Sequence, residues 1–297
     1  MTTKGSLINL GKLLLCSTVF AVGMMIGGMA VSVVGLQPPP MPEGVDGSLA
    51  FLILLLESPL LALALILLAR GLGGGLLPRA AALSSFTWVV YALNTAIETL
   101  AFTATTVEGG LSTAVSFLLP SILCGTAAAW LYPPRENGTN LAVLARVFFG
   151  GRTVGAWVWR IALSAVVFVP IYLLFGSLVA PLTAQYFQES MYGLRQPSQE
   201  EMVLVLLVRS ILFLLACVPI IVMWRRSRWG LFLSLGFALF MLVGLLYMLG
   251  AYYMPLAVRV PHTLEILADS YAHAGLLVML LTRSSPQIMR TAGVSPV

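Results

Sequence analysis

The chain has 297 residues, of which 59% are hydrophobic and 9% charged, and its formal net charge is +5. Soluble domains carry about 25% charged residues, so a soluble enzyme or binding domain is excluded. The positive charge does not indicate nucleic-acid binding, because the basic residues lie between apolar segments, where membrane topology places them. The composition therefore indicates an integral membrane protein in contact with the lipid bilayer.

Uninterrupted apolar runs of about 20 residues recur along the chain, long enough for α-helices to cross a bilayer. Their continuity excludes the alternating pattern of a membrane β-barrel. We predict an all-α, polytopic bundle of eight transmembrane helices at residues 8–36, 48–69, 79–105, 111–132, 158–183, 202–224, 228–253 and 262–282. We do not interpret the first run as a cleaved signal peptide, because it is too long and matches the fifth run in the repeat described below.

The basic residues predict the orientation of the bundle. With the N-terminus in the cytoplasm, only Arg195 and Arg259 lie in outer loops. The thirteen basic residues in cytoplasmic segments are Lys4, Lys12, Arg70, Arg79, Arg135, Arg146, Arg152, Arg160, Arg225, Arg226, Arg228, Arg283 and Arg290. This asymmetry follows the positive-inside rule, so we expect both termini in the cytoplasm. We expect a multi-pass protein of the plasma membrane, specifically the bacterial inner membrane.

The two halves of the chain resemble each other at a nearly constant offset. The matched pairs are Lys12 and Arg160, Gly28 and Gly176, Glu57 and Arg209, and Gly125 and Gly275, at shifts of 148 to 152 residues. Each half has an even number of spans, so the two copies would share one orientation, as in parallel repeats. We predict a first four-helix repeat at 1–136 and a second at 158–297. The cytoplasmic connector at 137–157 is either a short interfacial helix or an ordinary loop.

The last predicted span carries four ionisable residues along one edge. His262, Glu265, Asp269 and His273 are three or four residues apart, so they share one helix face. A charged side chain that faces hydrocarbon costs at least a few kcal/mol, so this edge must turn away from lipid. We expect His262 to be solvated at the interface. His273 is either a proton carrier or metal ligand, or a core histidine hydrogen-bonded to Asp269.

Ionisable residues of four predicted spans lie at nearly the same depth in the outer half of the membrane, counting about 1.5 Å per residue. They are Glu57, Glu98, Arg209 and Asp269. We predict a shared substrate- or ion-binding site of Glu57, Asn94, Glu98, Arg209, Glu265, Asp269 and His273. Aromatic residues of the longest outer loop, 185–201, are expected to pack over it.

Glu57 and Arg209 occupy matched positions with opposite charge. Across a pseudo-twofold axis they would face each other, either as a structural ion pair or as a gate or substrate clamp. Glu98, Asp269 and Glu265 would then lack a basic partner within the membrane. Such carboxylates either take up a proton or a cation, or remain hydrated in a shallow outer vestibule.

No sequence motif specifies an enzyme, a metal site or a cofactor. The sequence lacks HExxH, GxSxG, Walker and dinucleotide-binding motifs. Cys16, Cys124 and Cys217 are widely spaced, and we expect them to be buried as small apolar residues. The cofactor, if the protein uses one, is unknown from sequence.

Three classes of function fit these residues. The first, which we favour, is a proton- or cation-coupled transporter or permease that binds a small molecule or ion. The second is an intramembrane enzyme that uses Glu98, Asp269 and His273 as acid–base groups or metal ligands on a lipid-like substrate. The third is a non-catalytic subunit of a membrane complex, in which a partner protein binds and His273 ligates a haem or chlorin.

Overall fold

In a computed structural model of the chain, the described residues are 3–38, 45–134 and 140–282. Within these ranges the protein is α-helical and contains eight segments that are long and apolar enough to cross a membrane. The chain is thus an integral multi-pass membrane protein. Arg135, Arg283 and Arg290, which entered the orientation prediction, lie outside the described residues.

The first four spans are α1 (Thr3–Val33), α2 (Gly47–Ala69), α3 (Leu76–Thr87) continued by η1 (Trp88–Leu93) and α4 (Asn94–Phe102), and α5 (Val107–Ser116) followed by α6 (Leu118–Leu131). The connector contains α7 (Leu141–Phe149). The last four spans are α8 (Val154–Val166) followed by α9 (Phe168–Gln188), α10 (Gln199–Met223), α11 (Arg228–Leu239) continued by η3 (Phe240–Leu245) and α12 (Leu246–Gly250), and α13 (Leu256–Leu281). A short 3-10 turn, η2 (Met191–Gly193), lies between α9 and α10.

The prediction of eight spans is confirmed, and most predicted ends lie within a few residues of the helix ends. The largest differences concern the first, fifth and eighth spans, and α1 begins at Thr3, before the predicted start at residue 8. α9 continues to Gln188, so the first residues of the predicted loop 185–201 are helical. α13 begins at Leu256 and runs through Pro261, which the sequence places outside the span.

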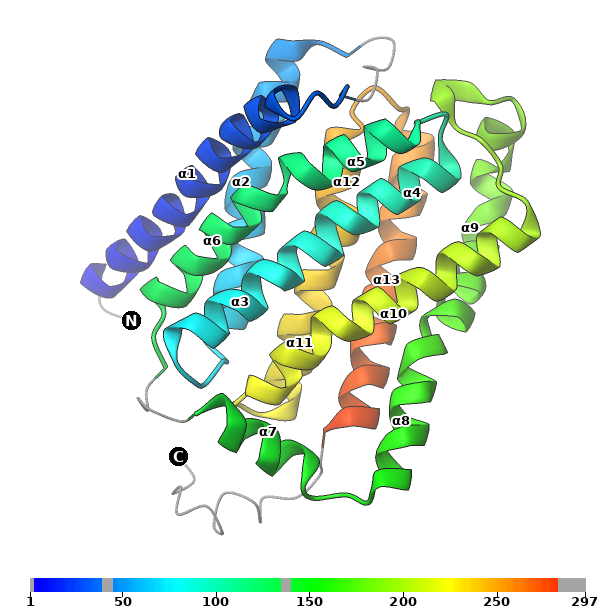
Figure 1. The fold of residues 1–297 in the computed structure, drawn as a ribbon. Coiled ribbons are helices and arrows are strands. Elements are labelled where there is room, and N and C mark those ends of the chain that lie inside the picture. The colour runs from blue at the N-terminus through cyan, green and yellow to red at the C-terminus, as the bar shows by residue number, and fades with distance from the viewer. Residues whose placement is uncertain (1–2, 39–44, 135–139, 283–297) are drawn as a thin grey trace.

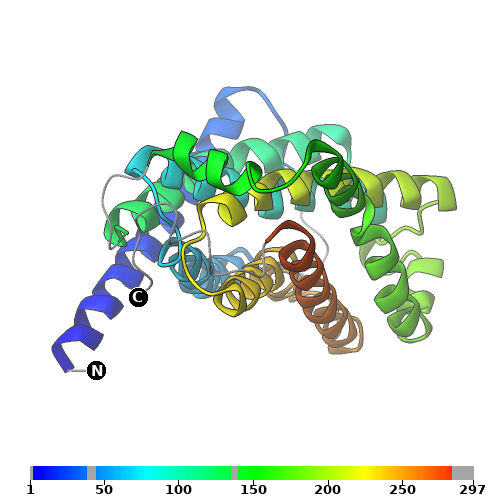
Figure 2. The ribbon, with the colours of Figure 1, turned by 90° about the horizontal axis from the view of Figure 1, so that it is seen from below.

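The outer helices lie on opposite sides of the bundle. Figures 1 and 2 show α1 on one side and the pair α8 and α9 on the other. α6 contacts both α1 and α3, and α13 contacts both α9 and α11. α7 lies across one end of the bundle, below the other helices in Figure 1, and contacts α10. All three cysteines are free and buried, as predicted.

Two features recur 152 residues apart. The third and seventh spans each contain a six-residue π-helical segment, Trp88–Leu93 and Phe240–Leu245. The loops that precede these spans pair with each other through two backbone hydrogen bonds. Gly73 N donates to Met223 O at 2.8 Å, and Arg225 N donates to Gly71 O at 2.8 Å. Each donor and each acceptor in this pair has its counterpart 152 residues away.

Candidate functional site

A cavity between α4, α9, α10, the α11–α12 span and α13 collects most of the predicted site residues. Its ionisable lining includes Glu98, Arg209, His262, Glu265, Asp269 and His273. The volume of the cavity open to water-sized molecules is about 110 Å³, which is room for several waters or for part of a small organic molecule. The rest of the wall is mostly apolar, so the cavity combines a polar side with a hydrophobic side.

Arg209 anchors the polar side of the cavity. It is 2% exposed, and its Nη2 atom pairs with Oε1 of Glu98 at 2.5 Å. Its Nε atom donates to Oδ1 of Asn94 at 2.8 Å, and Asn94 donates through Nδ2 to Oε2 of Glu98 at 3.2 Å. These three contacts form a closed network that joins the third and sixth spans. The contacts at Nη2 and Nε lower the cost of burying this cation, while its Nη1 atom has no hydrogen-bond partner among the described residues.

Aromatic rings surround the Arg209 guanidinium group. Its carbon atom lies 5.1 Å from the ring centre of Phe168, 5.5 Å from that of Tyr172 and 5.7 Å from that of Phe213. These distances fit cation–π attraction, which adds to the ion pair with Glu98. The His273 ring packs on the same cluster, 5.3 Å from Phe168 and 5.9 Å from Phe213.

The outer part of the α13 edge contains a hydrogen-bonded pair. His262 Nδ1 and Glu265 Oε2 are 2.8 Å apart. This hydrogen bond holds His262, and its side chain is only 22% exposed. The expectation that His262 is simply solvated at the interface is therefore wrong. A Cβ atom at Gly176 would lie 3.1 Å from Oε1 of Glu265, so the absence of a side chain there lets α9 pack closely against this carboxylate.

Asp269 and His273 line the inner part of the cavity. They are 3% and 1% exposed. Among the described residues, Oδ1 of Asp269 and Nε2 of His273 have no hydrogen-bond partner. The hydrogen bond predicted between these two side chains is therefore not formed at these atoms. Burial of an unsatisfied polar atom is costly, so both atoms are well placed to bind a ligand.

Glu57 does not line this cavity. The predicted pairing of Glu57 with Arg209 is wrong, because Arg209 pairs with Glu98. The reason is the packing of the spans: α2 contacts α11 and α12, whereas α10 contacts α3 and α4. Glu57 instead faces the seventh span, where a Cβ atom at Gly250 would lie 3.3 Å from Glu57 Oε1.

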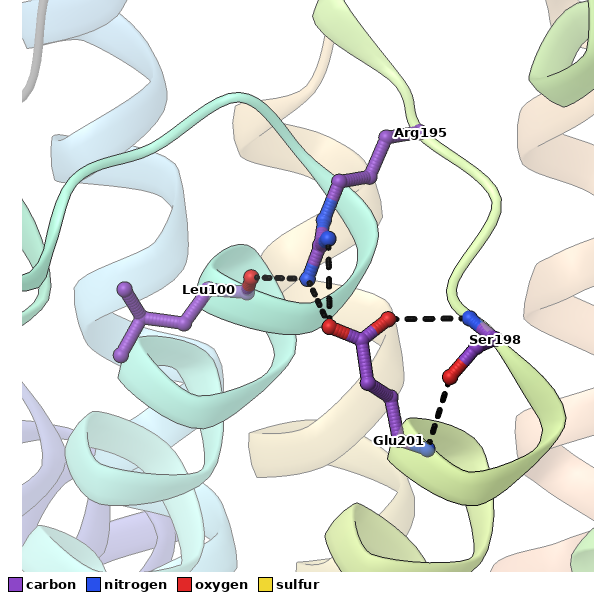
Figure 3. Close-up of polar contacts among 4 residues, drawn as sticks. All are labelled: Leu100, Arg195, Ser198 and Glu201. Atoms are coloured by element: carbon purple, nitrogen blue, oxygen red, sulfur yellow. Dashed lines mark hydrogen bonds and ion pairs between the residues drawn. The ribbon is translucent and has the colours of Figure 1, made fainter.

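The loop between α9 and α10 is held against the end of α4, beside the cavity. Leu194 lines the cavity and forms an isolated backbone bridge with Thr103. Next to it, Arg195 donates through Nη2 to Leu100 O at 3.0 Å and pairs with Glu201 at 3.4 Å (Figure 3). These contacts hold the loop against α4 at this part of the cavity lining. Of the aromatic residues expected to pack over the site, Phe187 lines the cavity, whereas Tyr192 is 43% exposed and does not.

Sequence reasoning missed the rings around Arg209. The signal was present, because Phe168 and Tyr172 are four residues apart, as are Arg209 and Phe213. Such pairs lie on one helix face, but their spacing alone resembles that of ordinary core residues.

Metal binding was one of the roles considered for the polar residues. Across the described part of the chain, no group of three or more His, Cys, Asp or Glu side chains is placed to hold a metal ion.

Comparison with known proteins gives no match to a family model, to a curated protein or to a solved structure. The function must therefore be argued from the cavity itself.

Proposed function

We propose that the protein is a proton- or cation-coupled transporter whose substrate site is the cavity lined by Arg209, Asp269 and His273. The observation that carries this proposal is Asp269, a carboxylate 3% exposed with an unpartnered Oδ1 atom among the described residues, in a cavity between helices of both halves. A carboxylate inside the membrane without a basic partner is favoured when it takes up a proton or binds a cation. Alternation between these states couples two fluxes.

The two carboxylates at the inner part of the cavity have different roles in this proposal. Glu98 is engaged by Arg209 and Asn94 through both oxygens, so it serves as a fixed connection between the third and sixth spans. Asp269 is the exchanging group. His262 and Glu265, which precede it on the same edge of α13, form a hydrogen-bonded pair that would deliver a proton toward it.

The proposal includes two parallel four-helix repeats related by a pseudo-twofold axis. The reciprocal hydrogen bonds of Gly71 and Gly73 with Met223 and Arg225 support it, because an axis between the two loops would generate one bond from the other. The two π-helical segments support it as well. Parallel repeats with a site near their interface occur in secondary transporters.

The orientation completes the proposal. With both termini in the cytoplasm, as the basic residues suggest, the loop that contains Arg195 lies on the outer side. The cavity then occupies the outer half of the membrane and receives its substrate from outside. Labelling of Glu200→Cys with a membrane-impermeant reagent in intact cells tests this, with the wild type, whose three cysteines are buried, as the background control. Protection of the introduced thiol would reverse the orientation.

The enzyme alternative has weaker support. Both oxygens of Glu98 are occupied, so this residue is not available as an acid or base without breaking the Arg209 network. The metal-dependent form of the alternative also lacks a cluster of ligands in the described ranges.

The test uses the full chain in proteoliposomes that contain a pH-sensitive dye. A panel of small cationic, zwitterionic, anionic and neutral solutes is added, and solute-dependent proton movement is recorded. We expect at least one solute to drive proton movement in the wild type and in Glu200→Gln, which alters an exposed carboxylate on α10. Asp269→Asn should abolish the movement while the purified protein remains monodisperse. Solute-driven proton movement of normal size in Asp269→Asn would contradict the proposal.

A further inference from the structure

The cavity has two chemically different walls. The polar wall is one edge of α13, where Glu265, Asp269 and His273 follow each other at intervals of four residues. An apolar part of the lining belongs to the neighbouring seventh span, where Leu239, Val243 and Tyr247 are also four residues apart. A ligand that fills this space has to be amphipathic, with a small polar group on one side and an apolar body on the other.

Three buried polar atoms of the cavity lining have no hydrogen-bond partner in the described ranges: the donor Arg209 Nη1, Asp269 Oδ1 and His273 Nε2. The Arg209 group is already paired with Glu98 and surrounded by aromatic rings, so the capacity left along α13 favours a ligand that donates. The two inner acceptor atoms are Asp269 Oδ1 and Nε2 of His273, which accepts when it is the unprotonated ring nitrogen. Both side chains are more than nine-tenths buried and line the cavity, and neither atom has a partner in the described ranges. A group with several N–H donors would satisfy both atoms at once.

The charge of the cavity favours a cation. Its cationic side chain, Arg209, is paired with Glu98 and enclosed by aromatic rings. Glu265 has His262 as its hydrogen-bond partner, whereas Asp269 forms no ion pair in the described ranges and its Oδ1 atom has no hydrogen-bond partner there. An anionic ligand would have to approach Asp269 and Glu265, and like charges in a poorly solvated site repel strongly.

A bare metal ion fits this site less well than an organic cation. A hard cation needs several oxygen ligands around it, whereas much of this wall is apolar. The described ranges also contain no set of three candidate ligands close enough together for a metal. An ammonium group needs fewer partners, and its apolar substituent would cover the wall formed by the seventh span.

We infer that the cavity binds a protonated primary or secondary amine with an apolar body, and that its ammonium group donates to Asp269 and His273. This inference rests on the proposed transport function, because it names the substrate class of the same site. The ammonium group replaces the water or proton that otherwise satisfies Asp269. The apolar body lies against Val243 and Tyr247.

Calorimetry on the purified full chain tests this with three probes of one shape: 2-phenylethylamine, 2-phenylethanol and phenylacetate. A hydrogen bond to a charged group stabilises binding enough to expect about tenfold or greater preference for the amine over the alcohol. Phenylacetate should bind more weakly than both. Asp269→Asn should remove about tenfold of the amine affinity, while Glu200→Gln should bind as the wild type does.

Equal binding of amine and alcohol, preferred binding of phenylacetate, or no binding of the amine by the wild type would overturn the inference. The comparison of probes on the wild type decides the question even if Asp269→Asn does not fold. Amine binding with neither proton movement nor cation-dependent amine uptake in proteoliposomes would keep this inference and reject transport. Proton movement driven only by anionic or neutral solutes would do the reverse.

Discussion

Two positions 152 residues apart have similar surroundings but different partners. Arg209 on α10 faces the third span and pairs there with Glu98. Glu57 on α2 faces the seventh span, and the residue it approaches is Gly250, which is 152 residues after Glu98. The two interfaces therefore use corresponding positions, yet one holds an ion pair beside a cavity and the other a carboxylate against a glycine.

This difference shows how a site arises on a scaffold of similar helices. The helix contacts at the two interfaces correspond, since α10 contacts α3 and α4 while α2 contacts α11 and α12. What differs is the side-chain chemistry at a few positions. The polar cavity depends on residues that only the interface of α10 with the third span combines, namely Arg209 with Glu98 beside the edge of α13.

The largest expected effect follows from removing the cation at the cavity. Arg209→Met leaves Glu98 buried without its charge partner, which should lower the free energy of unfolding by about 3–5 kcal/mol. Glu57→Gln, at the corresponding position of the other interface, should cost clearly less. Reversible unfolding in mixed micelles measures both variants.

A double variant separates the loss of the charge pair from a simple loss of packing. Combining Glu98→Gln with Arg209→Met removes both charges and should restore part of the stability lost in Arg209→Met alone. Equal losses for Arg209→Met and Glu57→Gln, with no recovery in the double variant, would show that the ion pair does not distinguish the interfaces.

Asn94 tests the hydrogen bonds of the network around Arg209. Asn94→Leu leaves Nε of Arg209 without its acceptor, so we expect a loss of about 1–3 kcal/mol in the free energy of unfolding. Thr99→Ala is the matched control, because its hydroxyl group bonds only within the same helix, to Ala96 O. The same unfolding assay decides, and a control that loses as much as Asn94→Leu would argue against a special role for the network.

Much of the fold was predictable from sequence because a helix that crosses a membrane requires a long apolar run. Each span is a continuous apolar run, so its existence and approximate ends followed from length and hydropathy. Depth was also predictable, since the rise of about 1.5 Å per residue fixes how far each ionisable group lies along its helix. This explains why Glu98, Arg209 and Asp269 were expected at one level and do line one cavity.

Which side chains pair between helices was not predictable in the same way. Depth does not give the rotation of a helix about its axis, or which helix is its neighbour, and Glu57 illustrates this. It lies on an interface with the seventh span, so its predicted pairing with Arg209 is wrong. The π-helical segments were missed because apolar sequence in a membrane helix does not reveal a change of hydrogen-bond register.

Transplanting the ion pair tests the correspondence of the two interfaces directly. Glu57→Arg and Gly250→Glu should each destabilise the protein, because each leaves an unsuitable group in a buried place. Together they would recreate the Arg209–Glu98 pair at the matched positions. We expect a favourable coupling energy of about 0.5–3 kcal/mol in a double-mutant cycle measured by unfolding. Additive losses would mean that the two interfaces differ in backbone geometry as well as in side chains.

The smallest effect on stability is expected at the loop beside the cavity, where Arg195 contacts Leu100 O and Glu201 (Figure 3). The Arg195 side chain is 42% exposed, and exposed ion pairs contribute little, so Arg195→Ala should barely change the melting temperature. Its effect should be local, because the backbone amides of Ala104 and Arg195 join this loop to the end of α4 by bonding to Gly193 O and Phe102 O. Hydrogen exchange at these two amides should be faster in Arg195→Ala and unchanged in Glu200→Gln. Unaltered exchange in Arg195→Ala would mean that the backbone bridge alone holds the loop, and that the side chain does not control access to the cavity.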